Sequence, residues 1–384
     1  MMCAVHVLYV IDSLIPGGAE RSLAAIAPHM VSRGVQLDVA YLHRRPGLQQ
    51  ELRATGARLH CLAGGGGRLG WLWRTRRLAG GTRPDLLHTT LFEADIAGRM
   101  AGWSSRLPVV SSLVNVAYGP EQAGRGVAGW KLRGAQLADA VTARSVTRFH
   151  AVSRHVAEEM GHRLRIPPDR IEVVPRGRDP QLLGRRTEAR RQAARAALGL
   201  DPDAPLLLAA ARQEAQKGLD TLVEAFAVLR RTLPASRLAL AGRDGGQTAT
   251  LHAQVERHGL GDSVRFLGTR DDIPELLCAA DVFVLPSRWE GLPGAILEAM
   301  ALETPVVASD LPMVREVVTD GLTARLVPAD QPATLAAAIL EVLGDPTGTS
   351  MRTGRARADF LERFTIERAA DRMLSLYERV LSSR

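Results

Sequence analysis

The amino-acid sequence predicts an α/β protein made of two doubly wound, Rossmann-like domains that face a central cleft. Short apolar runs alternate with helical segments along the chain, which is typical of parallel sheets covered by helices on both faces. The length of 384 residues suits two domains, and an apolar share of 46% allows each of them a core. A polar, arginine-rich stretch near the middle separates two series of such elements.

The first series defines an N-terminal domain over residues 1–182. It opens with a βαβ unit, in which an apolar run ends at the turn Pro16-Gly17-Gly18 and a helical pattern leads to a second apolar run. The strands of this domain are expected at residues 6–11, 36–42, 86–88, 108–113, 149–153 and 171–175, and its first helix at residues 19–33.

A linker is expected over residues 183–204, because this stretch is polar and ends in Asp201-Pro-Asp-Ala-Pro205. The second domain then covers residues 205–365. Its strands are expected at residues 205–211, 237–241, 264–267, 282–285 and 305–309. The last helix, residues 366–384, is amphipathic and has no strand after it to cover.

The charge differs between the halves. Residues 1–195 carry 29 Lys and Arg against 15 Asp and Glu, a balance of +14, whereas residues 196–384 carry 20 against 26, a balance of −6. The basic half would suit an anionic membrane surface or an anionic acceptor, or its arginines simply solvate helix faces. Nucleic acid is not expected as a partner, because the chain has no known binding module and no series of stacking aromatics.

Residues 68–77 combine two indoles, Trp71 and Trp73, with several arginines. Such a stretch either lies on an anionic membrane surface or forms an ordinary sheet-covering helix with its Trp side inward. Both interpretations are kept open.

Cysteine usage indicates the compartment. Cys3, Cys61 and Cys278 are scattered, without metal-ligand spacing or a disulfide framework, which fits a reduced, cytoplasmic environment. No run approaches the roughly 18 apolar residues of a membrane span. We therefore expect a soluble protein, at most peripheral to the inner face of the membrane.

The segment from Pro286 to Glu298 holds the densest group of chemically informative residues. It follows a strand that ends at Leu285, and a helix is expected to begin near Pro293, since proline suits a first helical turn. In parallel sheets ligands bind at this end of the strands, and a helix N-terminus there favours a phosphate.

Glu290 and Glu298 are the carboxylates of this segment. If the intervening chain is mostly helical, they lie roughly 12 Å apart at ~1.5 Å per residue. A glycosidase pair needs about 5–5.5 Å, or about 6.5–9.5 Å for inversion. The spacing favours two contacts to one long ligand, with a sugar at one end and a ribose at the other. A capped helix with an incidental glutamate is the alternative.

Two further motifs have both a functional and a structural interpretation. Arg212 and Lys217 follow another strand end, where they would neutralise a diphosphate leaving group or merely solvate a loop. Gly17 and Gly18 allow close approach of a ligand to the backbone, or form a tight turn without one.

Together these motifs resemble the family-4 retaining glycosyltransferases (glycosyl transferases group 1) of the GT-B fold. The resemblance covers nearly the whole chain. It is carried by Gly-Gly-Ala-Glu-Arg at 17–21, Ala151-Val-Ser153, Arg212 with Lys217-Gly218, Glu290-Gly-Leu-Pro with Glu298, Pro305-Val-Val-Ala-Ser309 and Glu316-Val-Val-Thr-Asp-Gly321.

The resemblance implies a complete set of donor contacts. Arg212 and Lys217 would bind the diphosphate, Glu298 the ribose hydroxyls, and Glu290 the transferred sugar at the catalytic centre. The remaining donor-binding residues would be Gly17, Gly18, Arg270, Asp272, Ile273, Gly291, Leu292, Pro293 and Gly294. Residues 269–273 would border the nucleobase, and backbone groups of residues 291–294 would approach the sugar and phosphates. No metal and no cofactor are expected beyond the sugar donor, and the last helix would cross back to the N-terminal domain.

The acceptor region departs from the family pattern. Relatives often carry histidine where this chain has Val114, beside Asn115, and further His and Asn where it has Thr90, Glu93 and Asp95. Their Asn-Gly-x-Asp motif is Arg176-Gly-Arg-Asp179 here. His88 remains as a catalytic candidate, and Asn115 and Glu93 mark the acceptor region.

The expected function is transfer of a sugar from a nucleotide-diphosphate sugar, a UDP-sugar being the expected donor, with retention of anomeric configuration. The acceptor would be a saccharide, a lipid-linked saccharide or a small molecule. The alternatives are a non-catalytic, nucleotide-sugar-binding partner of an active transferase, and another GT-B chemistry such as that of a phosphorylase or an epimerase.

Overall fold

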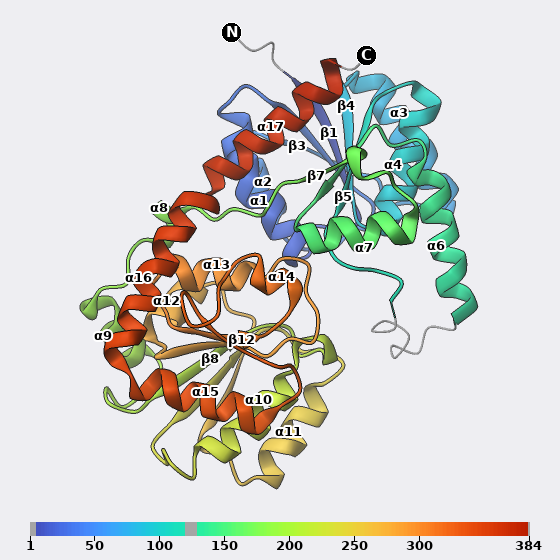
Figure 1. The fold of residues 1–384 in the computed structure, drawn as a ribbon. Coiled ribbons are helices and arrows are strands. Elements are labelled where there is room, and N and C mark those ends of the chain that lie inside the picture. Colours follow the sequence, from blue (N-terminus) through green and yellow to red (C-terminus); the bar gives the residue numbers. More distant parts are fainter. Residues whose placement is uncertain (1–4, 120–128, 383–384) are drawn as a thin grey trace. The chain divides into compact units, whose positions relative to one another are not determined.

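The computed structural model describes residues 5–119 and 129–382, so Cys3 lies outside the described residues. The chain divides into two compact units (Figure 1). Unit 1 comprises Met1–Gly177 and Ile366–Arg384, and unit 2 comprises Arg178–Thr365. Each unit is a doubly wound α/β structure around one parallel sheet, which confirms the predicted fold class.

Unit 1 contains a seven-stranded sheet in the order β3-β2-β1-β4-β5-β6-β7, with all pairs parallel. The strands are β1 (His6–Ile11), β2 (Gln36–Tyr41), β3 (Arg58–Cys61), β4 (Leu86–Thr90), β5 (Val109–Leu113), β6 (Arg148–Ala151) and β7 (Ile171–Val173). The order reverses between β1 and β4, so the loops after these two strands diverge and leave room for side chains between them.

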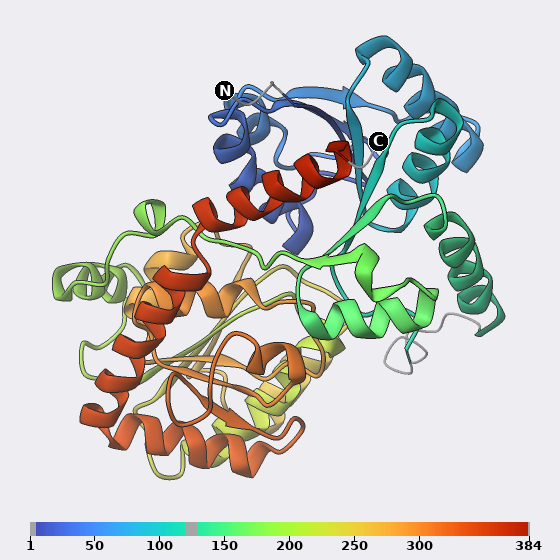
Figure 2. The same ribbon diagram turned by 45° about the horizontal axis from the view of Figure 1, so that its top comes forward.

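Helices cover both faces of this sheet (Figure 2). α1 (Gly18–Val31) packs against α17 (Ile366–Ser382), and both contribute to one hydrophobic core with β1 and β2. α4 (Phe92–Ser105) lies against β4 and β5 and packs with α3 (Gly67–Thr82). The other helices are α2 (Gln49–Ala54), α6 (Gly129–Ala143), α7 (Arg154–Leu164) and η1 (Pro168–Arg170).

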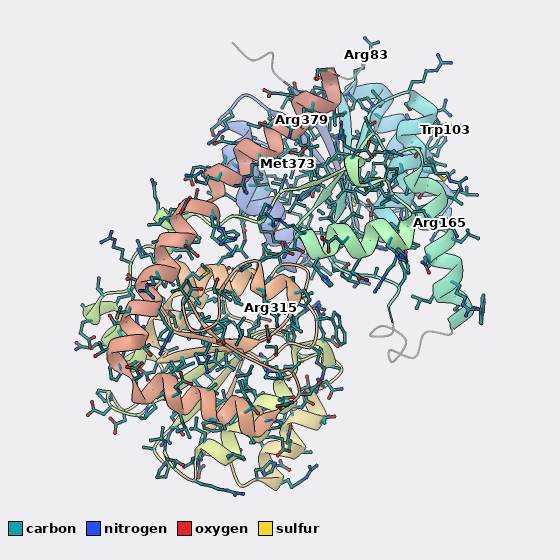
Figure 3. The ribbon with its side chains drawn as sticks, in the orientation of Figure 1. Arg83, Trp103, Arg165, Arg315, Met373 and Arg379 are labelled. Carbon is teal, nitrogen blue, oxygen red and sulfur yellow. The ribbon has the colours of Figure 1, made fainter. Side chains whose placement is uncertain are left out.

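α17 is an integral part of unit 1 although it follows unit 2 in the sequence. Met373 and Leu376 are buried in the core with β1, and Arg379 pairs with Glu172 of β7 (Figure 3). Its apolar side therefore replaces a strand-covering helix that the N-terminal segment alone does not supply.

Unit 2 contains a six-stranded parallel sheet in the order β10-β9-β8-β11-β12-β13. The strands are β8 (Leu206–Ala210), β9 (Arg237–Ala241), β10 (Val264–Gly268), β11 (Val282–Leu285), β12 (Val306–Ser309) and β13 (Arg325–Val327). The central strands are buried on both faces, which explains why their sequences are nearly continuous apolar runs.

The helices of unit 2 form two groups. α10 (Leu219–Leu229), α11 (Thr248–Arg257) and α15 (Pro332–Gly344) share one core with the sheet. α12 (Ile273–Ala279) packs with α9 (Glu188–Ala197), and α13 (Gly294–Ala301) packs with α16 (Pro346–Arg363). The short helices are α8 (Pro180–Leu183), η2 (Ala215–Lys217) and α14 (Pro312–Arg315).

The linker expected over residues 183–204 is not a linker in the structure. Its α9 packs on α12, and Arg195 is 2% exposed and donates to the carbonyl oxygens of Ala279 and Asp201. The many arginines of this stretch face carboxylates and carbonyls of unit 2, which composition alone does not reveal. The chain instead passes between the units after Gly177.

The indoles of α3 match neither interpretation of residues 68–77 completely. Trp71 is half-buried and meets the edge of His43, whereas Trp73 is 60% exposed and lies beneath Arg77. Thr75 and Ala79, rather than the Trp side, form the buried face. α3 packs against α4, so small side chains on its buried face suit a close approach of the two helices.

Candidate functional site

The candidate donor site of unit 2 lies where the strand order reverses, between β8 and β11. Several hydrogen bonds join the loop after β8 to the loop after β11, and two of them involve Gln216. Gln216 Nε2 donates to Trp289 O at 2.9 Å, and Arg288 N donates to Gln216 O at 2.8 Å. Residues that are distant in the sequence are thereby fixed beside one another.

Gly218 makes this close approach possible. Its φ is +59°, in the left-handed region, and a β-carbon at this position would lie 2.0 Å from Pro286 O. The turn that carries Lys217 therefore rests directly on the end of β11, and only glycine fits there.

Lys217 and Glu290 meet at the junction of the two loops. Lys217 Nζ lies 2.5 Å from Glu290 Oε1, and Ser287 Oγ donates to the same oxygen at 2.7 Å. Glu290 is 6% exposed, so these two partners compensate the loss of water around its charge. Within the described residues no hydrogen bond reaches Oε2 of Glu290, which leaves that oxygen as an acceptor.

Arg212 stands at the end of β8, half-buried. No carboxylate in the described part of the chain pairs with its guanidinium. A half-buried arginine without a counter-ion, in the same loop as Lys217, is suited to an anionic ligand.

Glu298 lies on α13 and is paired differently from Glu290. Its Oε1 accepts from Arg178 Nε at 2.6 Å, a contact that the sequence did not reveal. The guanidinium of Arg178 also lies over Gly294, where a β-carbon would be 2.1 Å from Nη2. Glu290 is in the loop and only Glu298 is in the helix, so the helical rise assumed for their spacing applies to only part of the interval.

The other predicted donor residues of unit 2 lie at the same edge of its sheet. Arg270 and Asp272 follow β10 and pair with each other at 2.7 and 2.5 Å, and hydrogen bonding from Arg270 lowers the pKa of Asp272. Ile273 begins α12. Gly291, Leu292 and Pro293 are buried in the loop before α13.

In unit 1, His88 belongs to a chain of hydrogen bonds. Tyr377 OH lies 2.6 Å from His88 Nδ1, and Ser112 Oγ lies 2.7 Å from His88 Nε2. Ser112 Oγ is also 2.9 Å from His150 Nδ1, and His150 Nε2 is 2.9 Å from Val174 O.

The carbonyl oxygen at one end of this series of hydrogen bonds determines which group donates and which accepts in each of them. Val174 O only accepts, so His150 Nε2 donates, and burial lowers the pKa of His150 to about 4, which leaves its Nδ1 as an acceptor. Ser112 therefore donates to His150 and accepts from His88 Nε2, and Tyr377 donates to His88 Nδ1. Both nitrogens of His88 are engaged, and the residue is 1% exposed with a pKa lowered well below 6.5 by burial. This geometry favours a structural role for His88 over the catalytic role implied by the resemblance.

A cavity of about 60 Å³ adjoins this chain of hydrogen bonds. Its walls include His88, Thr90 and Val114, with apolar side chains from α1 and α17 such as Ile26 and Met373. Because valine replaces the histidine common in relatives, this wall of the candidate acceptor region is apolar.

The two predicted acceptor residues are not in that wall. Glu93 Oε2 is 2.7 Å from His43 Nε2, and Asn115 is exposed at the end of β5. Gly17 is the N-cap of α1, and a β-carbon at Gly18 would lie 2.8 Å from Arg176 Nη1. The glycine turn therefore has a structural explanation within unit 1, because a residue without a side chain at position 18 leaves room for the guanidinium of Arg176.

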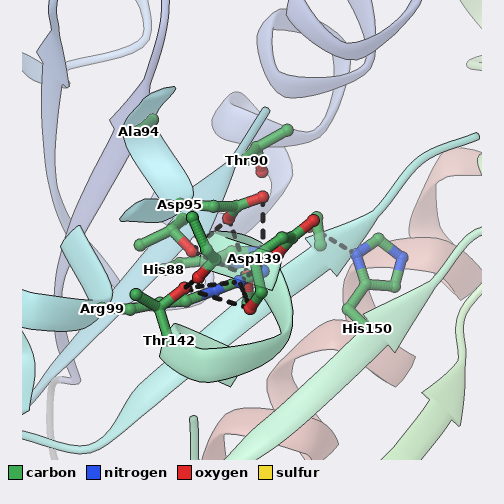
Figure 4. Close-up of polar contacts among 12 residues, drawn as sticks. His88, Thr90, Ala94, Asp95, Arg99, Asp139, Thr142 and His150 are labelled. Atoms are coloured by element: carbon green, nitrogen blue, oxygen red, sulfur yellow. Dashed lines mark hydrogen bonds and ion pairs between the residues drawn. The ribbon is translucent and has the colours of Figure 1, made fainter. Parts of the chain in front are cut away.

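Asp95, another departure from the family pattern, is part of a buried ionic cluster (Figure 4). Arg99 is 0% exposed and lies 2.5 Å from Asp139 Oδ1 and 3.4 Å from Asp95 Oδ2. Burial raises the pKa of Asp95 to about 6 despite this cation. Asp12, at the end of β1, accepts from Ala94 N at 2.7 Å, and burial raises its pKa to about 7.

Comparison with known proteins decides the family. The family described as "Glycosyl transferases group 1" matches residues 190–359, and "Glycosyltransferase Family 4" matches residues 16–182. The D-inositol 3-phosphate glycosyltransferase of Streptomyces bingchenggensis is 30% identical over 320 residues, which cover 77% of this chain and 68% of that protein. The chain belongs to this glycosyltransferase family.

Other relatives match this chain over shorter regions. The alpha-D-kanosaminyltransferase of Streptomyces kanamyceticus is 29% identical over 64% of each chain. Alignments with the mannosyltransferase LpsB of Rhizobium meliloti and the D-inositol 3-phosphate glycosyltransferase of Jonesia denitrificans cover 55% and 52% of those proteins.

Solved structures identify the fold of this chain as GT-B. Anabaena Alr3699/HepE in complex with UDP and glucose superposes with a TM-score of 0.87 at 23% identity, over 98% of this chain and all of that one. A glycosyltransferase from Rickettsia africae gives 0.82 at 17% identity, over 99% of each chain. HepE was also solved with UDP-glucose.

Within the described residues, neither a membrane-spanning helix nor a metal-binding cluster is present. None of the helices there combines the length and apolarity needed to cross a membrane. In the same part of the chain, no cluster of three or more His, Cys, Asp or Glu is arranged to hold a metal ion.

Proposed function

We propose that this protein transfers a sugar from a nucleotide-diphosphate sugar, with UDP as the first candidate nucleotide, to a hydroxyl acceptor with retention of configuration. The observation that carries the proposal is the Lys217–Glu290 pair at the point where the strand order of unit 2 reverses. Its support comes from the family and from solved neighbours that contain UDP and UDP-glucose.

Charge determines how the donor would be held. Arg212 lacks a counter-ion in the described structure, and Lys217 has two further N–H donors besides the one directed at Glu290. Together they would place N–H donors and positive charge beside the two phosphates of a diphosphate. The proposed departure of the leaving group uses these side chains and no divalent metal.

The carboxylates would orient the two ends of the donor. Oε2 of Glu290 accepts a hydroxyl hydrogen of the sugar, and Glu298 accepts those of the ribose. During transfer the bond between the anomeric carbon and the phosphate oxygen breaks, and a bond to the acceptor oxygen forms on the same face. The acceptor proton passes to the leaving phosphate, so the products are a glycoside and a nucleoside diphosphate.

The first experiment measures donor binding and turnover on the full chain. Calorimetry with UDP, GDP, ADP and dTDP identifies the nucleotide, and mass spectrometry follows transfer or hydrolysis of the matching sugar donor. Glu290→Gln and Arg212→Gln should each lower turnover by about 100-fold or more. Arg231→Gln, an exposed arginine elsewhere in unit 2, is the matched control. Unaltered turnover in either site variant would contradict the assigned roles.

A second candidate function is a non-catalytic nucleotide-sugar-binding partner of an active transferase. Val114 in the cavity wall and the fully engaged nitrogens of His88 favour it, because neither offers the acceptor side a polar group. It predicts donor binding without product for any acceptor in a cell extract. Activity that depends on inorganic phosphate would instead indicate a phosphorylase.

An anionic membrane surface is proposed as a partner of unit 1. α6 exposes Trp130, Leu137 and Val141 by 73, 66 and 52%. A surface hollow of about 370 Å³ beside them is lined by arginines of α6, of α7 and of the segments that follow these helices, namely Arg133, Arg144, Arg163, Arg165 and Arg170. Apolar side chains surrounded by cations are typical of interfacial helices.

Co-sedimentation with liposomes tests this partner. Vesicles with anionic lipid should retain the protein at low salt and release it at high salt, and purely zwitterionic vesicles should not retain it. The triple variant Arg133→Gln, Arg144→Gln, Arg165→Gln should lose binding. A control with Arg231, Arg257 and Arg355 of unit 2 replaced by Gln has the same net charge and should keep it. Equal loss in both variants would indicate a net-charge effect and reject this surface.

A further inference from the structure

Arg178 is placed at the donor site by a backbone that is held on both sides. It is the first residue of unit 2, its N–H donates to Phe364 O at 3.0 Å, and it bridges to Thr365. The next residue, Asp179, caps α8 by accepting from Gln181 N at 2.7 Å. The backbone position from which the side chain of Arg178 extends is therefore fixed.

From this point the guanidinium reaches the start of α13. Nε donates to Glu298 Oε1 at 2.6 Å, and the two side chains are 15% and 19% exposed. In this orientation the guanidinium occupies the space next to Gly294, where a β-carbon would lie 2.1 Å from Nη2. A side chain at residue 294 would therefore displace the guanidinium from this position.

The pairing with Arg178 leaves the two carboxylate oxygens of Glu298 in different states. Oε1 is committed to Arg178, and no hydrogen bond in the described residues reaches Oε2. A charge-assisted, partly buried hydrogen bond restricts the side chain to one orientation, which prepares the second oxygen for a ligand hydroxyl.

We propose that Arg178 is a positioning residue of the donor site, which holds Glu298 so that Oε2 meets a ribose hydroxyl of the nucleoside diphosphate. The proposal rests on the proposed function, because it takes the ligand of Glu298 to be a ribonucleotide. Arg178 acts through Glu298 and not as a third cation for the diphosphate. Its removal should therefore weaken recognition of the ribose and leave the other contacts in place.

Calorimetry on the full chain tests this proposal, with UDP, 2′-deoxy-UDP and 3′-deoxy-UDP as probes. Wild type should prefer UDP to the deoxy analogue that lacks the recognised hydroxyl. Arg178→Gln should weaken UDP binding by about tenfold while leaving binding of that analogue nearly unchanged. Glu298→Gln should show the same loss of preference, and the double variant should lose no more than either single variant. Arg178→Lys, which retains the charge but not the fork of N–H groups, should restore the preference only in part.

The experiment has one control variant, and its contrary outcomes separate the positioning role of Arg178 from the proposed function. Arg325→Gln removes a similarly buried arginine of unit 2 that pairs with Glu341 and Asp320, and it should bind like wild type. If Arg178→Gln weakens all three probes equally, or keeps the wild-type preference, the positioning role is wrong while the proposed function stands. If folded wild type binds none of UDP, GDP, ADP and dTDP, the proposed function fails and this inference fails with it. Thermal unfolding shows whether each variant is folded. If Arg178→Gln does not fold, Arg178→Lys takes its place in the comparison.

Discussion

Lys217 Nζ lies 2.5 Å from Glu290 Oε1, and the carboxylate that it neutralises is 6% exposed. The two residues belong to loops that follow neighbouring strands, and they meet because Gly218 lets one loop rest on the other. A single ion pair thus joins the diphosphate side of the proposed donor site to its sugar side.

Removal of the cation should affect both activity and stability. Lys217→Met leaves Glu290 buried without its counter-ion, which we expect to cost roughly 2–3 kcal/mol of unfolding free energy and at least about 100-fold in turnover. Urea unfolding and a donor assay measure the two effects. The double variant Lys217→Met, Glu290→Gln should recover stability but not activity. Recovery of neither would show that the cost comes from packing of the lysine stem.

Gly218→Ala should disrupt the junction of the two loops. The new β-carbon meets Pro286 O at 2.0 Å and adds the cost of a left-handed conformation, so we expect a loss of about 2–4 kcal/mol and weaker nucleotide binding. Gly259→Ala is the matched control, since its φ is +63° but nothing lies within 4 Å of its β-carbon. It should cost only about 1 kcal/mol. Equal losses in the two variants would mean that the contact with Pro286 is not limiting.

Burial of His150 makes the stability of the protein sensitive to acid. Its folded-state pKa is about 4 against 6.5 when exposed, so the unfolded chain binds more protons between these values, and stability falls as pH decreases through this window. Asp12 and Asp95 act in the opposite direction because their pKa values are raised. The measurement is therefore the stability difference between wild type and His150→Gln. It should shrink by on the order of 3 kcal/mol from pH 7 to pH 4. A difference independent of pH would show that His150 titrates normally.

Arg99 should be one of the most sensitive positions of unit 1. Arg99→Met leaves Asp139 and Asp95 buried without their cation, which we expect to cost about 3–5 kcal/mol. Arg33→Met removes an arginine whose partner, Asp371, is 63% exposed, and it should cost at most about 1 kcal/mol. Chemical denaturation measures both. A small loss at Arg99 would indicate that water or side-chain rearrangement solvates the two carboxylates.

Apolar runs located nearly all the buried strands, but they did not reveal two strands at the sheet edges. β3 carries Arg58 and His60, whose polar heads reach the buried Asp38, and β13 has only three residues. A strand at an edge is covered less completely than a central one, so its sequence need not be continuously apolar.

The predicted donor residues follow strand ends in a compact motif that can be recognised in the sequence, whereas the partners that they have in the structure could not be predicted. Arg178 lies 120 positions before Glu298, and Tyr377 lies 289 positions after His88. Nothing in local spacing relates such residues. Their pairing follows from the course of the chain between the units and from the return of α17 to unit 1. The arginines in the altered motif at residues 176–179 were the only signal available.

The place of α17 also has a consequence for how the protein is made. The ribosome completes unit 2 before it delivers Leu376 and Tyr377, which close the core of unit 1. The hydroxyl group of Tyr377 also donates to His88. Throughout that interval one face of the first sheet has only α1 and its neighbours against it, and its apolar side chains stay accessible to other nascent chains. The half of the molecule that is synthesised first is therefore the last to become complete.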